Sequence, residues 1–569
     1  MTRMTIDGHG ISSGLAIATA RVFPSQQSRF DKRLNIEAVD QRIERFQFAL
    51  QQTKIDVMKI RNYTEDQINV SQAAIFESYL LFLEDKDFIN IIIKGIEAGR
   101  DPIEVINAFR LQARTELSQM NDYFQDRQAD VDDILFRLVT HLLGETPYDL
   151  TEINDEIIIV LEDLTPSFMA ILHPRYIKGV IVKNGSRFSH ATMLAESLGI
   201  PVMRLDNDEH QKILNDDIII MDADEDVIIL RPDADDLKAF EARRKQLQAR
   251  EQELAGLKDQ PTVTHDGVDI QLMMNVNVKN HIKNFESSGA EGIGLVRTEL
   301  LFNTNQNIPS EEEQYNLYKS ILKSTEQSVT IRTFDFGGDK WPALDSEVEA
   351  NPFLGTRGVR YLLKHTDVLL TQLRALIRAS KYGNLSILFP FITTVDELKD
   401  LQRIIVNIEH ELKDDNIKFN EELSVGVMIE TPGAAMMTEQ FSRHCDFLAL
   451  GTNDLVQYMF AADRGNDNVS KYYDTTHPAV LKIIREAIKG ANIAEKPVTV
   501  CGDIASDRLM IPLLIGLGVR TLSVDPQYIL KMRAMIKEMS VTSLEKLVDR
   551  AIRADGGEQV ALLVNDYLR

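Results

Sequence analysis

The carboxyl-terminal half of the chain alternates short apolar runs with longer helical patterns, and this alternation constrains the fold more than any other feature. The apolar runs lie at 270–276, 292–297, 329–335, 385–390, 425–430, 446–451, 498–502 and 520–524. Eight successive strand–helix repeats are typical of one (β/α)8 barrel rather than of an open sheet. We therefore predict a TIM barrel over residues 261–569.

The amino-terminal half contains three further patterns. Apolar residues recur at helical spacing over 36–145, which predicts an inserted bundle of antiparallel helices with a polar outer face. Short β-branched runs within 1–35 and 146–232 predict one compact α/β domain. Residues 233–260 are rich in charge and favour helix, so we expect a solvated linker helix before the barrel. The predicted fold class is thus a multidomain α/β protein.

Charge and cysteine content exclude several classes of protein. The 569 residues carry a formal charge of −24, which argues against nucleic acid or an anionic membrane as a partner and favours a basic protein. The two cysteines, Cys445 and Cys501, give no disulfide framework. The N-terminus lacks the apolar core of a signal peptide, and no apolar run approaches the roughly 20 residues that span a bilayer. We therefore expect a cytoplasmic protein.

Polar residues follow the predicted barrel strands, where the active site of such a barrel lies. Arginines at these strand ends or in the segments after them can bind phosphate and carboxylate in bidentate geometry; they are Arg297, Arg332, Arg357 and Arg464. Any one of them could instead form a structural salt bridge, but their convergence on one rim is hard to explain by packing. The pattern indicates a small, highly anionic substrate.

Two carboxylates follow the fifth and sixth predicted strands. Glu430 and Asp454 supply hard oxygen ligands, and two protein carboxylates completed by substrate oxygens and water are expected for Mg²⁺, with Mn²⁺ as an alternative. Cys501 lies at the end of the seventh strand. It could be a buried small hydrophobe, or its S–H could donate a proton to an enolate carbon, and the spacing leaves both interpretations open.

His190 follows a predicted strand and a turn of small residues. A helix is predicted to begin at this histidine, and the N-terminus of a helix favours a bound phosphoryl group. By local context alone, a capping or core histidine is the simpler explanation. The rest of the chain therefore decides its role.

These motifs resemble, over the whole length of the chain, those of Enzyme I of the bacterial sugar phosphotransferase system, a family of phosphoenolpyruvate–protein phosphotransferases. Residues 446–464 (DFLALGTNDLVQYMFAADR) are close to the signature of phosphoenolpyruvate-using enzymes. Further similar blocks are 294–299 (GLVRTE), 351–357 (NPFLGTR) and 500–502 (VCG).

The resemblance implies a two-step phosphorelay. Phosphoenolpyruvate would bind to polar groups at the barrel rim, namely Arg297, Arg332, Arg357, Asn453, Asp454 and Arg464. Mg²⁺ would lie on Glu430 and Asp454. The phosphoryl group would pass to His190, and Cys501 would protonate the resulting enolate to give pyruvate. Phospho-His190 would then transfer its phosphoryl group to a histidine of the small carrier HPr, docked on the helical insertion. Residues 233–260 would act as the hinge, and the barrel would form a homodimer.

The chain departs from the family pattern around the histidine. Glycine is usual at Ser186, threonine at Phe188 and arginine at Glu196. Phe188 removes a hydroxyl that could orient the imidazole, and Glu196 reverses a charge near the phosphoryl group. A weakly active regulatory protein that senses phosphoenolpyruvate is therefore an alternative to an active phosphotransferase. Four departures lie elsewhere, at Ser13, Phe168, Ala449 and Asp503.

A second enzyme class shares the histidine domain and the barrel. Pyruvate phosphate dikinase and phosphoenolpyruvate synthase need a large ATP-grasp domain ahead of the histidine. Residues 36–145 are too short for that domain and carry no Gly-rich phosphate loop, which disfavours this class.

Overall fold

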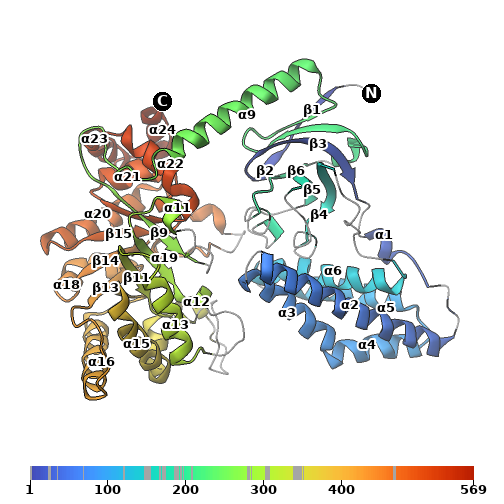
Figure 1. Cartoon of the computed structure of the whole chain (residues 1–569), viewed down its shortest axis with the longest axis horizontal. Coiled ribbons are helices and arrows are strands. Elements are labelled where there is room, and N and C mark those ends of the chain that lie inside the picture. Colours follow the sequence, from blue (N-terminus) through green and yellow to red (C-terminus); the bar gives the residue numbers. More distant parts are fainter. Residues whose placement is uncertain are drawn as a thin grey trace. The chain divides into compact units, whose positions relative to one another are not determined.

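The chain divides into two compact units, Met1–Ala249 and Arg250–Arg569, each with its own hydrophobic cores (Figure 1). The computed structural model describes residues 3–23, 27–34, 36, 38–67, 70–118, 122–145, 155–165, 168, 175–184, 191–192, 195, 198–206, 209–277, 282, 285–301, 308–337, 349, 351–464 and 469–569. The division falls inside the predicted linker helix, which is α9 (Ala234–Ala255) and buries only Phe240 among its residues. The predicted boundaries of the four segments stay a prediction.

The first unit contains an eight-stranded mixed sheet with the order β1-β8-β7-β3-β4-β5-β6-β2. The strands are β1 (Met4–Asp7), β2 (His9–Ser12), β3 (Leu15–Val22), β4 (Ile157–Asp163), β5 (Ile177–Asn184), β6 (Val202–Arg204), β7 (Ile218–Asp222) and β8 (Val227–Leu230). The neighbours from β3 to β6 are parallel, and the remaining pairs are antiparallel. A short 3₁₀ helix, η1 (Glu209–Lys212), follows β6.

Both faces of this sheet are buried at its centre. Along β4, Ile157 and Ile159 belong to one apolar core, whereas Ile158 and Val160 belong to the core on the other face. Successive side chains of a strand point to opposite faces, so a strand covered on both sides reads as a continuous apolar run. This is the pattern from which the sequence predicted the strand.

The helical insertion packs around a core of its own. Its helices are α1 (Gln27–Phe30), α2 (Val39–Gln67), α3 (Val70–Glu84), α4 (Lys86–Glu97), α5 (Pro102–Ser118) and α6 (Asp122–Leu142). Phe46, Val57 and Ile60 of α2 are buried against Leu135 and Leu138 of α6, among other residues of this core. The predicted bundle of helices is therefore present.

The second unit contains a closed barrel of eight parallel strands, as predicted. The strands are β9 (Gln271–Val276), β10 (Ile293–Arg297), β11 (Ser328–Arg332), β12 (Asn384–Phe389), β13 (Ser424–Ile429), β14 (Phe447–Gly451), β15 (Val498–Cys501) and β16 (Thr521–Val524). β16 pairs with β9 and closes the barrel.

Helices follow the strands and cover the barrel. They are α11 (Phe285–Ser288), α12 (Thr298–Leu301), α13 (Glu311–Leu322), α14 (Val359–Lys364), α15 (Thr366–Ala379), α16 (Val395–Asp414), α17 (Pro432–Met436), α18 (Thr438–Ser442), α19 (Thr452–Phe460), α20 (Pro478–Ile493), α21 (Met510–Gly516), α22 (Pro526–Lys537), α23 (Val541–Ala551) and α24 (Gly557–Leu568). Short 3₁₀ helices are η2 (Pro352–Leu354), η3 (Ser380–Tyr382), η4 (Ser470–Tyr472) and η5 (Asp503–Ala505). Among the described helices, none is both long and apolar enough to cross a membrane.

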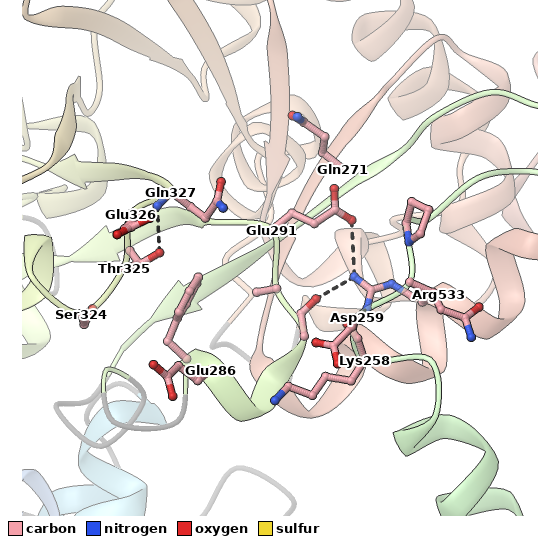
Figure 2. Close-up of a pocket in the computed structure, with 15 residues that line it drawn as sticks. Lys258, Asp259, Gln271, Glu286, Glu291, Ser324, Thr325, Glu326, Gln327 and Arg533 are labelled. Atoms are coloured by element: carbon pink, nitrogen blue, oxygen red, sulfur yellow. Dashed lines mark hydrogen bonds and ion pairs between the residues drawn. The ribbon is translucent and has the colours of Figure 1, made fainter.

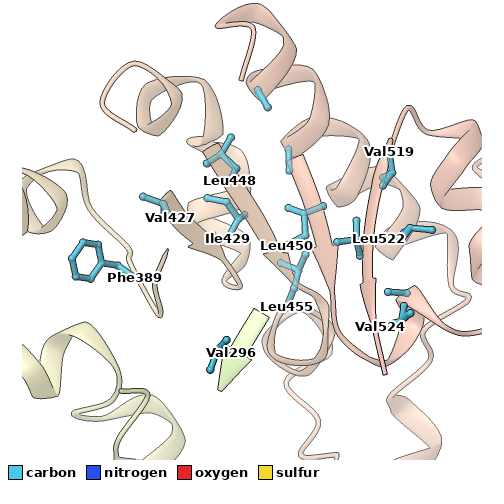
Figure 3. Packing of buried hydrophobic residues seen from close by; sticks show 14 of the residues in the cluster. Val296, Phe389, Val427, Ile429, Leu448, Leu450, Leu455, Val519, Leu522 and Val524 are labelled. Atoms are coloured by element: carbon cyan, nitrogen blue, oxygen red, sulfur yellow. The ribbon is translucent and has the colours of Figure 1, made fainter. Parts of the chain in front are cut away.

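Side chains alternate between two cores in the barrel. Leu448 and Leu450 of β14 pack into the large core that includes residues of the surrounding helices (Figure 3). Ala449, between them, joins a separate small cluster with Met428 and Cys501. The period-2 alternation of a strand therefore points Cys501 into the barrel.

Candidate active site

A cavity of about 200 Å³ lies at the carboxyl ends of the barrel strands. Its lining consists of Leu295, Arg297, Glu299, Arg332, Met428, Glu430, Gly451, Asn453, Asp454, Arg464, Cys501 and Gly502. The lining includes every barrel residue predicted for the site except Arg357. Residues that are far apart in sequence thus meet at the end of the barrel where catalysis takes place in this fold.

Arg332, the last residue of β11, is buried in the wall of the cavity. Its guanidinium pairs with Glu299 and lies 3.5 Å from Asp335. Although burial opposes the charge, these carboxylates raise the pKa of Arg332 above its ordinary value. Within the described part of the chain, Arg332 Nε and Glu299 Oε2 have no hydrogen-bond partner. Buried polar atoms are normally satisfied, so these two atoms indicate a polar ligand.

Arg357 is not among the residues that line the cavity, and it holds one of the predicted metal ligands. It is 1% exposed, and its two terminal nitrogens donate to the two carboxylate oxygens of Asp454. Its Nε and Nη2 also donate to Asp335, each at 3.2 Å. In this arrangement, Arg357 orients Asp454, and its predicted contact with the substrate stays a prediction.

Asp335 is a site residue that the sequence analysis did not select. It is fully buried and accepts from Arg357 while facing Arg332, so it joins two of the predicted arginines. The available signal was its position three residues after Arg332, in the same polar block at the end of a strand.

Glu430 follows β13 and is almost fully buried, with Oε1 accepting from the backbone N–H of Phe391 at 2.5 Å. Phe391 has a positive φ of 55°, an uncommon conformation for a residue other than glycine. Glycine at position 451 allows the backbone to lie close to the Glu430 carboxylate, since a Cβ there would lie 2.7 Å from Glu430 Oε2. Burial, together with the charges of Asp454 and Asp335, raises the pKa of Glu430 to about 8.

The carboxylates fit a divalent cation. Burial and the nearby charges of Asp454 and Asp335 disfavour the ionised form of Glu430, and a bound cation would stabilise that form. Carboxylate oxygens are the ligands that Mg²⁺ takes in proteins, usually one or two of them together with water and substrate. Among the described residues, no group of three or more His, Cys, Asp or Glu side chains could hold a metal. Glu430 and Asp454 would therefore share the cation with substrate and water.

Cys501 presents a protonated thiol to the cavity. It is 2% exposed, and Sγ donates to the carbonyl of Leu450 at 3.6 Å. Burial raises the pKa of this thiol to about 12. The next residue, Gly502, has a φ of 145°, and a Cβ there would lie 2.2 Å from Thr452 Oγ1. Glycine at this position thus lets the end of β15 approach the start of α19.

Asn453, in the first turn of α19, and Arg464, four residues after the end of this helix, both line the cavity. The side-chain oxygen of Asn453 accepts from the backbone N–H of Asp503 at 2.9 Å, which leaves its amide N–H groups as donors. The side chain of Arg464 is exposed, whereas its backbone N–H donates to Gln457 Oε1 at 3.3 Å.

The predicted phosphohistidine, His190, lies outside the described residues, as do Ser186, Phe188 and Glu196. Ala191 and Thr192, directly after it, are helical. Phe168 belongs to the same apolar core as Ala191, and its ring meets the ring of Phe23 edge to face at 5.5 Å. At position 168, where the chain departs from the family pattern, an aromatic ring therefore fills part of this core.

A larger cavity, of about 820 Å³, lies at the other end of the barrel strands (Figure 2). Gln271, Glu291 and Gln327 line it, and each lies at or just before the start of a strand. Arg533 is buried there, and its N–H groups donate to carbonyls that include that of Gly289 and to Glu291. Arg533 thus forms structural hydrogen bonds to the segment that precedes β10. The arginines suited to an anionic substrate line the cavity at the carboxyl ends of the strands instead.

Comparison with known proteins gives matches to three family models. The matching models are PEP-utilising enzyme, N-terminal, over residues 7–127; PEP-utilising enzyme, mobile domain, over 153–226; and PEP-utilising enzyme, PEP-binding domain, over 251–541. Curated proteins named phosphoenolpyruvate-protein phosphotransferase are also similar over their full length. One from Staphylococcus aureus (strain MSSA476) is 35% identical over 575 residues, one from Mycoplasma capricolum subsp. capricolum is 34% identical over 571, and one from Listeria innocua serovar 6a is 34% identical over 570. Each alignment covers 99% of this chain and 99% of the relative.

Proposed function

The chain belongs to the family of PEP-utilising enzymes, and from this premise we propose that it transfers the phosphoryl group of phosphoenolpyruvate to its own His190 and then to a histidine of an HPr-type carrier protein. The observation that carries this proposal is the cavity at the carboxyl ends of the barrel strands. There Arg332, Glu430 and Cys501 line one space of about 200 Å³ that suits a small anionic substrate.

Arginine side chains bind the substrate's phosphate and carboxylate groups. Arg297, Arg332 and Arg464 line the cavity, and the fork of a guanidinium matches either group in bidentate geometry. Asn453 adds amide N–H donors to the same space. Arg357 contributes indirectly, because it holds Asp454 in place.

The metal in this proposal is Mg²⁺, held by Glu430 and Asp454. When bound, it supplies positive charge that stabilises the charge developing on oxygen as the phosphoryl group leaves. Phe391 orients Glu430 through its backbone N–H, and Arg357 orients Asp454. Both carboxylates therefore keep a fixed position.

In the first chemical step, the P–O bond of phosphoenolpyruvate breaks and a P–N bond forms on the imidazole of His190. The family match over 153–226 and the sequence motif support this assignment of the histidine. The enolate left behind takes a proton at carbon from Cys501, which yields pyruvate. A thiol whose pKa is raised to about 12 stays protonated at neutral pH, so it can act as this donor.

The second step needs a protein partner. We propose that an HPr-type carrier docks on the helices of the 36–145 insertion and accepts the phosphoryl group from phospho-His190. The acidic net charge of −24 favours a carrier with a basic contact surface. We further propose that the barrel forms a homodimer and that the protein works in the cytoplasm.

The proposal is tested by transfer to a carrier. The full chain is incubated with Mg²⁺, labelled phosphoenolpyruvate and each HPr-type protein of the same genome, and labelled carrier and released pyruvate are both measured. Stoichiometric label on a carrier histidine supports the proposal. Label that appears only with ATP would instead indicate a dikinase. Phosphoenolpyruvate binding without any transfer would indicate a sensor.

A further inference from the structure

The polar block at the end of β11, residues 332–335, leaves the sheet while the chain is still buried. Thr333, Phe334 and Asp335 follow the last residue of the strand, and all three are fully buried. Ile331 and Phe334 both belong to the large outer core although they are three positions apart, so the two-residue alternation of a strand ends between them. Irregular backbone that is buried still needs partners for its N–H and C=O groups.

One side-chain amide from the surrounding helices supplies such partners. Gln372 lies on α15 and is fully buried. Its Oε1 accepts from the backbone N–H of Phe334 at 2.9 Å. Its Nε2 donates at 3.3 Å to the hydroxyl of Thr298, and this hydroxyl donates to the backbone carbonyl of Arg332 at 2.9 Å. The amide of Gln372 thus holds the peptide groups on both sides of Thr333, one directly and one through a hydroxyl.

The orientation of this amide is fixed by a further buried chain of hydrogen bonds. Nε2 of Gln372 also donates to the hydroxyl of Tyr318 at 3.0 Å, and this hydroxyl donates to Gln314 Oε1 at 3.0 Å. Gln314 in turn donates to the backbone carbonyl of Pro309 at 2.9 Å. Reversal of the Gln372 amide would set its N–H groups against the N–H of Phe334, so the network favours one orientation.

The two ends of the polar block carry parts of the active site. Arg332 lines the cavity. Asp335 accepts hydrogen bonds from Arg357, which itself holds the carboxylate of Asp454. Because only two residues separate Arg332 from Asp335, a shift of the backbone between them would move both side chains. Groups that are held in place before binding reduce the entropy that binding costs.

We propose that Gln372 is a positioning residue for the reaction: its amide fixes the backbone of the polar block, so that Arg332 stays directed at the substrate and Asp335 at the arginine that holds Asp454. The inference rests on the proposed function, in which Arg332 binds phosphoenolpyruvate. Gln372 itself is absent from the cavity lining and acts through the backbone that it holds.

The test compares Gln372→Met with the matched variant Tyr318→Phe in the full chain. Both substitutions break hydrogen bonds of the same buried network, so we expect both to lower the melting temperature. Only Gln372→Met releases the polar block. For this variant, we expect the Kd of phosphoenolpyruvate, measured by calorimetry, and the KM in the phosphotransfer assay each to rise about five- to twentyfold. We expect kcat to stay within about threefold, whereas a partly unfolded protein would lose kcat and keep its KM.

Hydrogen exchange of the Phe334 amide reports the same effect without any ligand. We expect this amide to exchange at least about tenfold faster in Gln372→Met than in the wild type, because its acceptor is lost, and to stay near the wild-type rate in Tyr318→Phe. Thr298→Val is a milder variant that removes only the hydroxyl link to Arg332. It should raise the Kd about two- to fivefold, and it decides the matter if Gln372→Met does not fold.

Three outcomes would overturn the inference. They are an unchanged Kd in Gln372→Met or, if that variant does not fold, in Thr298→Val; an equal rise of the Kd in Gln372→Met and Tyr318→Phe; and a fall in kcat with an unchanged KM. A wild type that binds phosphoenolpyruvate without turnover would count against the proposed function alone, because calorimetry still compares the Kd values. If the wild type did not bind phosphoenolpyruvate at all, exchange at Phe334 would still decide whether Gln372 holds the polar block.

Discussion

Arg357 holds Asp454 through two parallel hydrogen bonds, Nη1 to Oδ1 at 2.8 Å and Nη2 to Oδ2 at 3.0 Å. Both side chains are buried, and Asp335 binds the other edge of the guanidinium. Arg357 thus supports a carboxylate that lines the cavity.

Arg357→Lys should weaken the site while keeping the positive charge. An ammonium cannot reproduce the bidentate fork, so we expect the barrel to lose about 2 kcal/mol of stability, as for a hydrogen bond to a charged group. The metal-dependent affinity for phosphoenolpyruvate should fall as Asp454 loses its orientation. Urea unfolding and calorimetry measure the two effects. Arg403→Lys, at an arginine whose side chain is 74% exposed, is the control. Equal behaviour of the two variants would refute the supporting role.

Cys501→Ala should slow the formation of pyruvate by about 10²- to 10⁴-fold, the usual contribution of a general acid, and leave the affinity for phosphoenolpyruvate nearly unchanged. Because the pKa of the thiol is raised to about 12, the S–H form persists through neutral and mildly alkaline solution. The wild-type rate should therefore show no loss that is due to this thiol between roughly pH 6 and 9.

Cys445→Ala is the matched control for this variant. Cys445 is also buried, and burial raises its pKa to about 12, but it does not line the cavity. Stopped-flow measurement of pyruvate release compares the two variants. A normal rate in Cys501→Ala would show that another group protonates the enolate.

Glu430→Gln should weaken the response of the protein to Mg²⁺. A ligand that binds only the folded state raises the melting temperature, so Mg²⁺ should stabilise the wild type. The variant should need at least about tenfold more Mg²⁺ for the same effect, since it loses one of two protein ligands. Without metal, the variant should be at least as stable as the wild type, because a neutral amide relieves the charge beside Asp454 and Asp335.

Thermal scans with and without Mg²⁺ or EDTA provide this measurement. Glu422→Gln removes an exposed carboxylate and serves as the control. A shift by Mg²⁺ that is equal in Glu430→Gln and the wild type would place the metal elsewhere.

The double variant Phe188→Thr/Glu196→Arg restores the residues usual near the histidine. For an adapted enzyme, we expect the rate of autophosphorylation to stay near that of the wild type. A large gain in rate would mean that the natural residues suppress transfer and would favour a sensor of phosphoenolpyruvate. Rapid-quench measurement with labelled phosphoenolpyruvate distinguishes these outcomes, and equal binding affinity in both proteins verifies that the barrel is unaffected.

The barrel could be predicted because each of its strands corresponds to a recognisable local pattern in the sequence. Buried parallel strands produce short apolar runs, and eight of them at regular intervals favour a single closed barrel. β6 (Val202–Arg204) gave no apolar run long enough to be predicted as a strand, since it has only three residues. Within the first unit, the sequence predicted β4, β5, β7 and β8 from the same kind of run.

The site was predicted less completely, because contacts between distant residues leave no local pattern. Arg357 and Asp454 are 97 positions apart, and the sequence could not show that they pair. Tyr473 donates a hydrogen bond from its hydroxyl to the backbone carbonyl of Asn453, 20 positions away, and this contact too leaves no local pattern. Arg332, Glu430 and Cys501 were found because strand ends of a barrel share one rim. The role of His190 rests on its motif and on the family.

The most direct test of the proposal locates the phosphoryl group. The full chain is incubated with labelled phosphoenolpyruvate and Mg²⁺, quenched at alkaline pH and digested, and the labelled peptide is identified by mass spectrometry. We predict one phosphoryl group on His190, labile in acid, absent from His190→Ala and released to pyruvate upon back-titration. Label on another residue, or a wild type that binds phosphoenolpyruvate but takes up no label, would contradict the assignment.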